Sequence, residues 1–367
     1  MTRPLSHRGN RKVRRPSWTL SACHTSAMNR ILLLATLAAC STVPPFHPRD
    51  APSECAPETD AIFCSRLGTA CDDLTGTDNC GETRTANCGT CGGADVCVAH
   101  ACVMPLCSTL SFPNRVLIDA VNDHGDQDRL SGVSATGETL LWQRSCCGDL
   151  LSCNLWIADW DGHKFVPQNL TDLTALTPIA VGETDVLTMT ADGLTIIGAS
   201  WGGLDDTEFF QATRTAIGST TFGSASNSDF AALTVASPSR LSSPAISGDK
   251  LAFYFRISGN TDRTKNGLYE TIRDSTAVPF PPATRLPKEL QVYKSINGIS
   301  SDRMTLFVQD GAHVTALTRK SLREPFTTLG AAPIPGFDTR PLGDCQRLVG
   351  TYSALGCADQ EIAIFTK

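Results

Sequence analysis

Met189-Thr-Ala-Asp-Gly-Leu-Thr-Ile-Ile197 carries a two-residue turn followed by an apolar strand, and a second strand follows at Glu208 to Arg214. Glycine supplies the positive φ that tight turns between strands require. The stretch therefore predicts two strands joined in one unit. Such a unit cannot bury both of its faces alone, so we expect it to pack against units of the same kind.

The same pattern occurs five times beyond residue 108. The turns lie at Gly137, Gly193, Asp249, Asp302 and Asp344, with spacings of 56, 56, 53 and 42 residues. The segments that carry turn and strand are Val133–Trp142, Met189–Ile197, Ala245–Phe255, Gly298–Phe307 and Pro341–Val349. The second strands are expected at Asn154 to Trp160, Glu208 to Arg214, Gly267 to Arg273, Ala312 to Arg319 and Gln360 to Thr366. In the first four units a phenylalanine follows, at Phe165, Phe222, Phe280 and Phe326.

A strand-turn-strand repeat of roughly 50 residues is typical of radial stacking, which leaves few open sheet edges. We therefore predict an all-β fold, a β-propeller over residues 108–367. Five repeats favour five blades, and six blades result if residues 109–120 belong to an additional one.

The second unit, with Ala191-Asp-Gly-Leu194 and Phe209-Phe-Gln-Ala-Thr-Arg214, resembles the repeat of TolB-type propellers. The first and fifth units depart from this pattern, with Thr136-Gly137 and Gly343-Asp344 at the turn. The resemblance implies a propeller that holds a partner on its rim. This is an argument from fold, and a fold does not determine a function.

Residues 28–40 read as a signal peptide, with a short basic start at Met28, an apolar stretch and a cysteine. The stretch is shorter than the roughly 20 apolar residues of a membrane-spanning helix. Leu37-Ala-Ala-Cys40 resembles the lipobox of bacterial lipoproteins, which implies lipidation at Cys40 and removal of residues 1–39. Leu20-Ser-Ala-Cys23 lacks an apolar run before it, and we interpret that second match as chance. We expect Met28 to be the true start.

Acyl chains at Cys40 would anchor the protein to a membrane without a spanning segment. By resemblance to lipoprotein sorting in Gram-negative bacteria, Ser41 and Thr42 imply the outer membrane. The proline-rich residues 40–54 are then a lipidated tether. Residues 1–39 hold seven of the 31 basic residues and no acidic one, so the remainder has 24 basic and 37 acidic residues, a net charge of −13. Such a chain is a poor partner for nucleic acid.

Residues 55–107 form a cysteine-rich segment whose disulfides are expected to take the place of a large hydrophobic core. The pair Cys88 and Cys91 could suggest zinc, but an exported chain favours disulfides. The run from Phe63 to Cys91 resembles a small module of secreted myxobacterial proteins, which implies export and no particular chemistry. The cysteines of this segment are Cys55, Cys64, Cys71, Cys80, Cys88, Cys91, Cys97, Cys102 and Cys107.

The segment 55–107 holds nine cysteines, an odd number, and the chain beyond residue 108 holds five, which is also odd. These five are Cys146, Cys147, Cys153, Cys345 and Cys357. If every cysteine pairs, at least one disulfide must join the two parts. Cys345 and Cys357 lie at opposite ends of one strand, about 23 Å apart at ~3.3 Å per residue, which is too far for a disulfide. We predict Cys107–Cys345, with one of Cys146 and Cys147 bonded to Cys153 and the other to Cys357.

Motifs that suggest chemistry are few. Gly198-Ala-Ser200-Trp-Gly202, with Asp206 and His313, matches the chain order of an α/β-hydrolase, but a nucleophile elbow leads into a helix, and here a strand is expected. Asp123, Asp126 and Asp128 offer oxygen ligands for calcium, although a solvated acidic loop is the favoured interpretation. The histidines show no HExxH spacing. We expect no metal, no cofactor and no catalytic residue.

Two function classes remain open. The first is an outer-membrane lipoprotein whose propeller binds a protein or a polysaccharide without catalysis. The second is an extracellular hydrolase of glycosidase type, with carboxylates from different blades in the propeller channel. We prefer binding.

Overall fold

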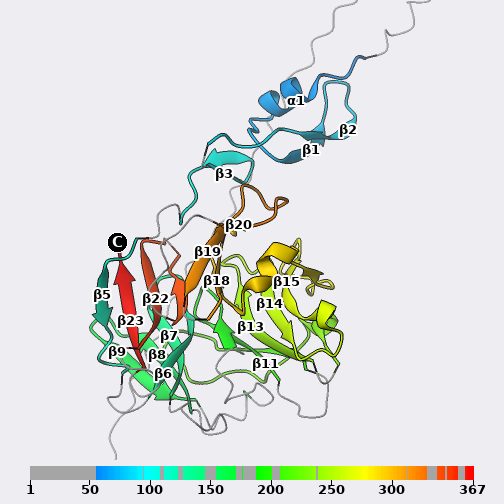
Figure 1. Ribbon diagram of the computed structural model, residues 1–367. Coiled ribbons are helices and arrows are strands. Elements are labelled where there is room, and N and C mark those ends of the chain that lie inside the picture. Colours follow the sequence, from blue (N-terminus) through cyan, green and yellow to red (C-terminus); the bar gives the residue numbers. More distant parts are fainter. Residues whose placement is uncertain are drawn as a thin grey trace, which may run out of the picture. The chain divides into compact units, whose positions relative to one another are not determined.

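The computed structural model describes residues 55–93, 95–107, 111–122, 127–144, 154–170, 176, 187–200, 207–236, 239–311, 313–328, 337–343, 345–353 and 360–367. Cys40, Cys146, Cys147, Cys153 and Cys357 lie outside these residues, as do Asp123, Asp126 and Asp206. The described chain from residue 55 onward belongs to one unit. Its strands beyond residue 113 form five antiparallel sheets, which are the blades of a β-propeller (Figure 1).

The blades follow one another along the chain, and each begins with its inner strand. The first contains β6 (Asp128–Val133), β7 (Thr139–Arg144), β8 (Asn154–Trp160) and β9 (Phe165–Asn169). The second contains β10 (Leu187–Met189), β11 (Thr195–Ala199) and β12 (Phe209–Thr213). The third contains β13 (Arg240–Ile246), β14 (Ala252–Ser258), β15 (Gly267–Ile272) and β16 (Thr284–Arg285). The fourth contains β17 (Ser295–Ile299), β18 (Thr305–Gln309), β19 (Val314–Thr318) and β20 (Thr327–Thr328). Short 3-10 turns are η2 (Ala231–Leu233), η3 (Arg263–Lys265) and η4 (Lys288–Val292).

The fifth blade is completed by a strand from the other end of the propeller. It contains β21 (Phe337–Pro341), β22 (Arg347–Ser353) and β23 (Gln360–Thr366), and β5 (Asn114–Leu117) pairs with β23 as its outer strand. Figure 1 shows β5 and β23 side by side although nearly 250 residues separate them. The alternative of a sixth blade from residues 109–120 is therefore wrong, because β5 closes the fifth.

The ring is closed by contacts between successive inner strands. These contacts join β6 to β10, β10 to β13, β13 to β17, β17 to β21 and β21 back to β6. A Cβ at Gly132 would stand 2.8 Å from the Met189 Cβ, so glycine is needed where β6 approaches β10. The apolar core lies between the blades, in clusters that each combine residues of neighbouring sheets.

The hairpin turn between the first two strands is built around a serine or threonine in the first four blades, and Leu342 takes this place in the fifth. In the third blade, the Ser247 N–H donates to the Ala252 carbonyl, and the Ser247 hydroxyl accepts the Ala252 N–H, both at 2.9 Å. Ser134, Thr190 and Ser300 make the same bonds in their blades. The left-handed residue is Gly137, Gly193, Lys250, Arg303 or Cys345. The last three follow, by one residue, the aspartates that the sequence placed at the turn.

Every blade has an equivalent position at the end of its third strand. The backbone N–H of the residue there donates to the carbonyl of the residue that follows the left-handed one in the hairpin turn. Its occupants are Trp160, Arg214, Arg273, Arg319 and Lys367. Each lies near a phenylalanine. Trp160 contacts Phe165, and Arg214 forms a backbone bridge with Phe222. The Arg273 guanidinium lies 4.2 Å from the Phe280 ring centre, and that of Arg319 lies 4.5 Å from Phe326. In the fifth blade the ring is Phe112, which lies just before β5 and 5.8 Å from the Lys367 ammonium. The phenylalanine repeat therefore has a fifth member that comes first in the chain.

The three arginines at this position are buried, and each pairs with a carboxylate of the preceding blade. Arg214 bonds Asp159 at 2.6 Å across the interface between the first and second blades. Arg273 bonds Asp229, and Arg319 bonds Glu270, at the next two interfaces. In each case the arginine Nε donates to the carbonyl of the left-handed residue in its own hairpin turn. Each arginine thus joins two blades and fixes the turn of one.

Asp159 is held in its charged form by these contacts. Burial acts to raise the pKa of its carboxyl, but hydrogen bonds from Arg214 and Thr139 outweigh burial and hold the pKa below the ordinary value. The Thr139 hydroxyl donates to Asp159 at 2.7 Å, and the Gly218 N–H donates at 2.9 Å. The two charges are therefore paired and their remaining hydrogen-bonding positions are satisfied, as a buried ion pair requires.

The cysteine-rich segment contains α1 (Asp60–Arg66), the hairpin of β1 (Asp73–Thr77) with β2 (Thr83–Asn87), and the hairpin of β3 (Val96–Val98) with β4 (Ala101–Val103). Its core is small: Phe63 is fully buried, with the guanidinium groups of Arg66 and Arg84 lying 5.6 and 5.0 Å from its ring centre. Four disulfides hold the segment, Cys55–Cys80, Cys64–Cys88, Cys71–Cys97 and Cys91–Cys102. Disulfides therefore supply the constraint that a larger core would supply elsewhere.

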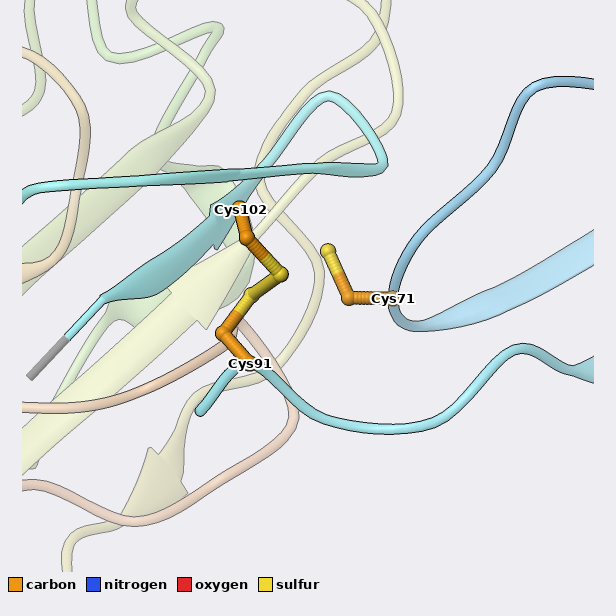
Figure 2. A group of neighbouring side chains, drawn as sticks. All are labelled: Cys71, Cys91 and Cys102. Carbon is orange, nitrogen blue, oxygen red and sulfur yellow. A yellow bond between two sulfur atoms is a disulfide. The ribbon is translucent and has the colours of Figure 1, made fainter. Parts of the chain in front are cut away.

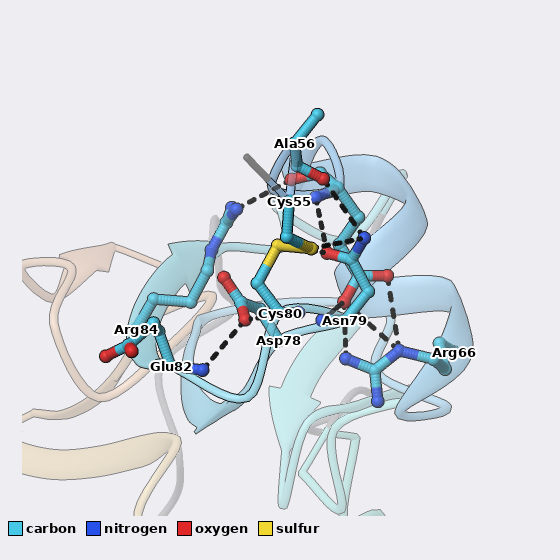
Figure 3. Close-up of a disulfide and its surroundings, with 9 residues drawn as sticks. Cys55, Ala56, Arg66, Asp78, Asn79, Cys80, Glu82 and Arg84 are labelled. Atoms are coloured by element: carbon cyan, nitrogen blue, oxygen red, sulfur yellow. Dashed lines mark hydrogen bonds and ion pairs between the residues drawn. A yellow bond between two sulfur atoms is a disulfide. The ribbon is translucent and has the colours of Figure 1, made fainter. Parts of the chain in front are cut away.

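Polar contacts surround the first of these disulfides (Figure 3). Glu58 forms an ion pair with Arg66, and both its backbone and its side chain bond Asn79, the neighbour of Cys80. Asp78 accepts the N–H groups of Cys80 and Glu82 and so forms the turn between β1 and β2. The start of the segment is thereby tied to the hairpin by side chains as well as by sulfur.

A fifth disulfide joins Cys107 to Cys345, the residue in the left-handed position of the fifth hairpin turn. This pairing confirms the prediction from the odd cysteine numbers. In the neighbouring blades the left-handed residue is a cation that reaches the aspartate of the preceding turn, as Lys250 reaches Asp192 and Arg303 reaches Asp249. In the fifth blade Cys345 replaces this cation, and the N–H of Leu106 donates to Asp302 instead.

We predict that Asp159→Asn lowers the free energy of unfolding by about 3 kcal/mol at pH 7, because the Arg214 charge would stay buried without its partner. The matched control is Asp192→Asn, which removes a partly exposed pair and should cost less than about 1 kcal/mol. The lowered pKa of Asp159 means that its contribution is present above the unfolded pKa and is lost as the pH falls through the folded one. Urea unfolding at several pH values should show the free energies of unfolding of the wild type and of Asp159→Asn converging in acid. A difference between these free energies that widens in acid would contradict this assignment.

We also predict the disulfide pattern of the purified protein. Trypsin cleaves after Arg347, so Cys345 and Cys357 end in different peptides. Non-reducing mass mapping should find the Cys345 peptide joined to the one that holds Cys107. The pairing of Cys146, Cys147, Cys153 and Cys357 stays a prediction that the same map decides. A Cys345–Cys357 link would contradict the closure of the fifth blade.

Candidate functional site

The propeller channel, where the structure describes it, is narrow and lined by both apolar and polar residues. Two small cavities of about 40 and 50 Å³ lie between the inner strands. Val133, Met189, Ile299 and Pro341 line both of them. Sites for small molecules have volumes of roughly 300–1,000 Å³, so these cavities are too small for a sugar ring.

The carboxylates of the described inner strands are held by arginines. Asp128, at the start of β6, is fully buried and accepts hydrogen bonds from Arg144 at 2.8 Å and from the Trp142 indole at 3.0 Å. Asp338 in β21 pairs with Arg129 at 3.1 Å. Of the calcium candidates, Asp128 therefore has a structural partner, and Asp123 and Asp126 lie outside the described residues.

Ser200 lies at the end of β11, where its hydroxyl accepts the Glu208 N–H at 3.1 Å. β11 runs antiparallel to β12, so this serine belongs to the blade's own strand pair. His313 belongs to the turn before β19 in the fourth blade, where its carbonyl accepts the Asp310 N–H. Ser200 and His313 thus come from different blades and take part in separate turns.

The sulfur atoms of Cys71, Cys91 and Cys102 lie within 4.8 Å of one another (Figure 2). A metal would need free thiolates. Here Cys91 is bonded to Cys102, and Cys71 is bonded to Cys97. Cys88, the other half of the CxxC pair, is bonded to Cys64. The cluster is therefore a pair of adjacent disulfides.

A cavity of about 680 Å³ forms a cleft between the fifth and first blades, hereafter the Trp160 cleft. Its lining residues are Ala135, Thr136, Gly137, Glu138, Trp160, Phe165, Gly343, Arg347 and Ile364. Trp160 occupies the position that holds a buried arginine in the next three blades. An indole cannot form the ion pair that those arginines make with the preceding blade, and Trp160 remains 41% exposed.

Trp160 is supported from one side by Phe165, whose ring stands nearly perpendicular to it at 5.2 Å between centres. The Trp160 N–H donates to the Glu138 carbonyl, which fixes the start of the following turn. Arg347 reaches across the cleft and donates to the Thr136 carbonyl at 3.5 Å. The cleft thus combines an exposed aromatic surface with one acidic and one basic side chain.

The sequence contains a signal for this cleft. The repeat pattern ends in arginine at residues 214, 273 and 319, and the first unit has tryptophan there. Where the other repeats have a buried arginine in an ion pair, the first has an exposed aromatic side chain, which indicates that this position serves binding rather than the joining of blades.

A search for membrane-spanning helices in the described part of the chain found none with the required length and hydropathy.

Comparison with known proteins finds no matching protein-family model and no matching curated protein. Among solved structures, TolB from Acinetobacter baumannii aligns at 10% identity and a TM-score of 0.37, covering 84% of this chain and 67% of that one. A TolB protein from Agrobacterium tumefaciens aligns at 12% and 0.41, covering 66% and 77%. A xylan β-1,4-xylosidase from Bacillus halodurans aligns at 13% and 0.40, covering 66% and 53%. These scores are low, so the propeller assignment rests on the strand pairing of this chain.

Proposed function

We propose that this protein is a lipid-anchored binding protein of the bacterial cell envelope, and that its propeller holds a polysaccharide in the Trp160 cleft without catalysis. The observation that carries the proposal is the replacement of a buried arginine by an exposed tryptophan in a cleft between two blades. The volume of about 680 Å³ lies within the range of small-ligand sites.

The chemistry of the cleft favours a saccharide. A sugar ring presents C–H groups that pack on an aromatic face, and hydroxyls that both donate and accept hydrogen bonds. The indole of Trp160 offers a large, rigid apolar surface at the side of the cleft. Glu138 supplies acceptors and Arg347 supplies donors at its edge. The two kinds of contact that a sugar ring needs are therefore present together.

The absence of catalysis is part of the proposal. Glycoside cleavage ordinarily uses two carboxyl groups on opposite sides of the bond. Within the described lining of the cleft, Glu138 is the one carboxylate. The carboxylates of the described inner strands, Asp128 and Asp338, pair with Arg144 and Arg129. A hydrolase that used this cleft would have to draw its second carboxyl group from elsewhere.

Location at the outer membrane is proposed from the sequence at Leu37 to Cys40 and at Ser41 and Thr42. Acylation at Cys40 would hold the cysteine-rich segment and the propeller at a membrane surface through the tether. A binding protein anchored at that surface would retain a polysaccharide at the cell envelope.

We expect Trp160→Ala to weaken polysaccharide binding at least tenfold, because it removes the surface on which a sugar ring packs. Trp160→Phe should retain a large part of the affinity. Val166→Ala is the matched control, since Val166 is an exposed apolar residue next to Phe165 and does not line the cleft. Affinity electrophoresis of the detergent-solubilised protein in gels that contain envelope polysaccharides measures the effect. Equal retardation of wild type and Trp160→Ala in every gel would overturn the saccharide proposal.

Cys40→Ser should move the protein from the membrane fraction to the soluble fraction, because the acyl chains would have no attachment site. Cys23→Ser should leave the distribution unchanged, because residue 23 lies before the expected start at Met28 and before the cleavage site at Cys40. Partitioning in Triton X-114 with an immunoblot measures both. Detergent-phase recovery of Cys40→Ser would refute lipid anchoring at this residue.

A further inference from the structure

A second cavity, about 620 Å³, lies at the edge of the third blade, hereafter the arginine pocket. It is formed by the loop between β14 and β15, by Arg285 in β16, and by Gln291 and Tyr293 in and after η4 (β14 and β15 are labelled in Figure 1). Its lining residues are Arg256, Gly259, Asn260, Thr261, Arg263, Asn266, Gly267, Arg285, Gln291 and Tyr293. It shares no lining residue with the Trp160 cleft.

The loop that forms one wall is braced by its own side chains. The Asn266 amide accepts the Asn260 N–H at 2.9 Å and donates to the Asn260 carbonyl at 3.1 Å. Asn260 also donates to Ser239 at 2.8 Å and so ties the loop to the segment before β13. Asp262 caps η3 by accepting the N–H and the hydroxyl of Thr264. The wall is therefore formed before any ligand arrives.

The opposite wall is held by Gln291. Its amide accepts the Leu268 N–H at 2.7 Å and donates to the carbonyl of Leu286 at 2.7 Å. A Cβ at residue 267 would overlap this amide, and Gly267 has a φ of +146°. Glycine is thus required for Gln291 to approach the strand. The side-chain amides that brace the two walls are thus bonded to other groups of the protein.

The groups left to face the pocket are donors. Arg256 and Arg263 make no ion pair or side-chain hydrogen bond within the described part of the chain, and Arg285 uses one nitrogen to bond the Asn266 carbonyl. The hydroxyls of Thr261 and Tyr293 likewise make no hydrogen bond among the described residues. Each guanidinium carries five N–H donors and no acceptor. No carboxylate lies in the described lining, and Asp262 turns to Thr264.

Three arginines together are notable in a chain with a net charge of −13 beyond residue 39. Three cations that repel one another are stabilised by a ligand that supplies negative charge and several acceptors. The planar guanidinium matches the oxygens of phosphate, sulfate and carboxylate groups in pairs. The volume exceeds what an inorganic oxyanion fills, and the Tyr293 ring and the Thr261 hydroxyl remain for the rest of the ligand.

We propose that the arginine pocket binds an acidic sugar, whose phosphate, sulfate or carboxylate group is held by Arg256, Arg263 and Arg285. The sugar ring lies toward Tyr293 and Thr261. This site is separate from the Trp160 cleft and does not depend on the function proposed for that cleft. The Trp160 cleft then takes the ring of a sugar, and the arginine pocket takes a sugar that carries an anionic group.

The test is isothermal titration calorimetry of the detergent-solubilised full chain with glucose 6-phosphate, glucose 6-sulfate, glucuronate, glucose and inorganic phosphate. At least one of the three acidic sugars should bind, and its affinity should fall as salt is raised. Glucose should not bind, and inorganic phosphate should bind at least tenfold more weakly than that acidic sugar. The three acidic sugars distinguish which oxyanion the pocket prefers.

The variant Arg263→Gln combined with Arg285→Gln should weaken the acidic sugar at least tenfold. Both side chains are exposed, so folding should be retained, and a thermal melt checks this. Lys265→Gln is the matched control, because it removes a charge from the same turn without lining the pocket. Trp160→Ala should leave this binding unchanged. The proposal is overturned if no acidic sugar binds, if the double variant binds as well as the wild type, or if phosphate binds as tightly as the sugar.

Discussion

The buried arginine at the end of the third strand is the interaction on which the propeller depends. Arg214, Arg273 and Arg319 each bond a hairpin carbonyl of their own blade and a carboxylate of the blade before, and Arg273 and Arg319 also lie over a phenylalanine ring of their blade. A single side chain thereby sets the turn, the position of the outer strand and the angle to the neighbouring sheet. Burial makes the charge costly without its partner, so the blades cannot separate locally without exposing an unpaired ion.

Both candidate sites can be understood from this constraint. The Trp160 cleft opens at the interface where the arginine is replaced, because an indole fills the space without drawing the fifth blade toward it. The arginine pocket lies at the edge of the third blade, and the ion pair between Arg319 and Glu270 holds this blade to the fourth. Arg256, Arg263 and Arg285 therefore lie on a rigid edge, and their mutual repulsion is not relieved by movement of the sheets.

Much of the fold could be predicted from the sequence, because its repeats express local rules. The turns at Gly137 and Gly193 and the strands at Asn154–Trp160 and Gln360–Thr366 lie where glycine and alternating apolar residues placed them. Closure by β5 could not be predicted in the same way, since a four-residue strand carries little pattern and its partner lies at the other end of the chain. The cleft escaped prediction because its signal was one substitution within a repeat. The arginine pocket escaped because its cations lie on separate elements and meet only after the blade has formed.

The Cys107–Cys345 bond determines how the protein carries mechanical load. Traction on the chain at residue 55 or before it reaches Cys107 before it reaches β5 at Asn114. Without the disulfide, that traction would peel β5 from β23 one hydrogen bond at a time and open the ring at its weakest edge. With the disulfide, the force passes through sulfur into the hairpin turn of the fifth blade, and the four-residue strand bears none of it. Tension applied to the chain before residue 107 therefore leaves the ring of blades closed.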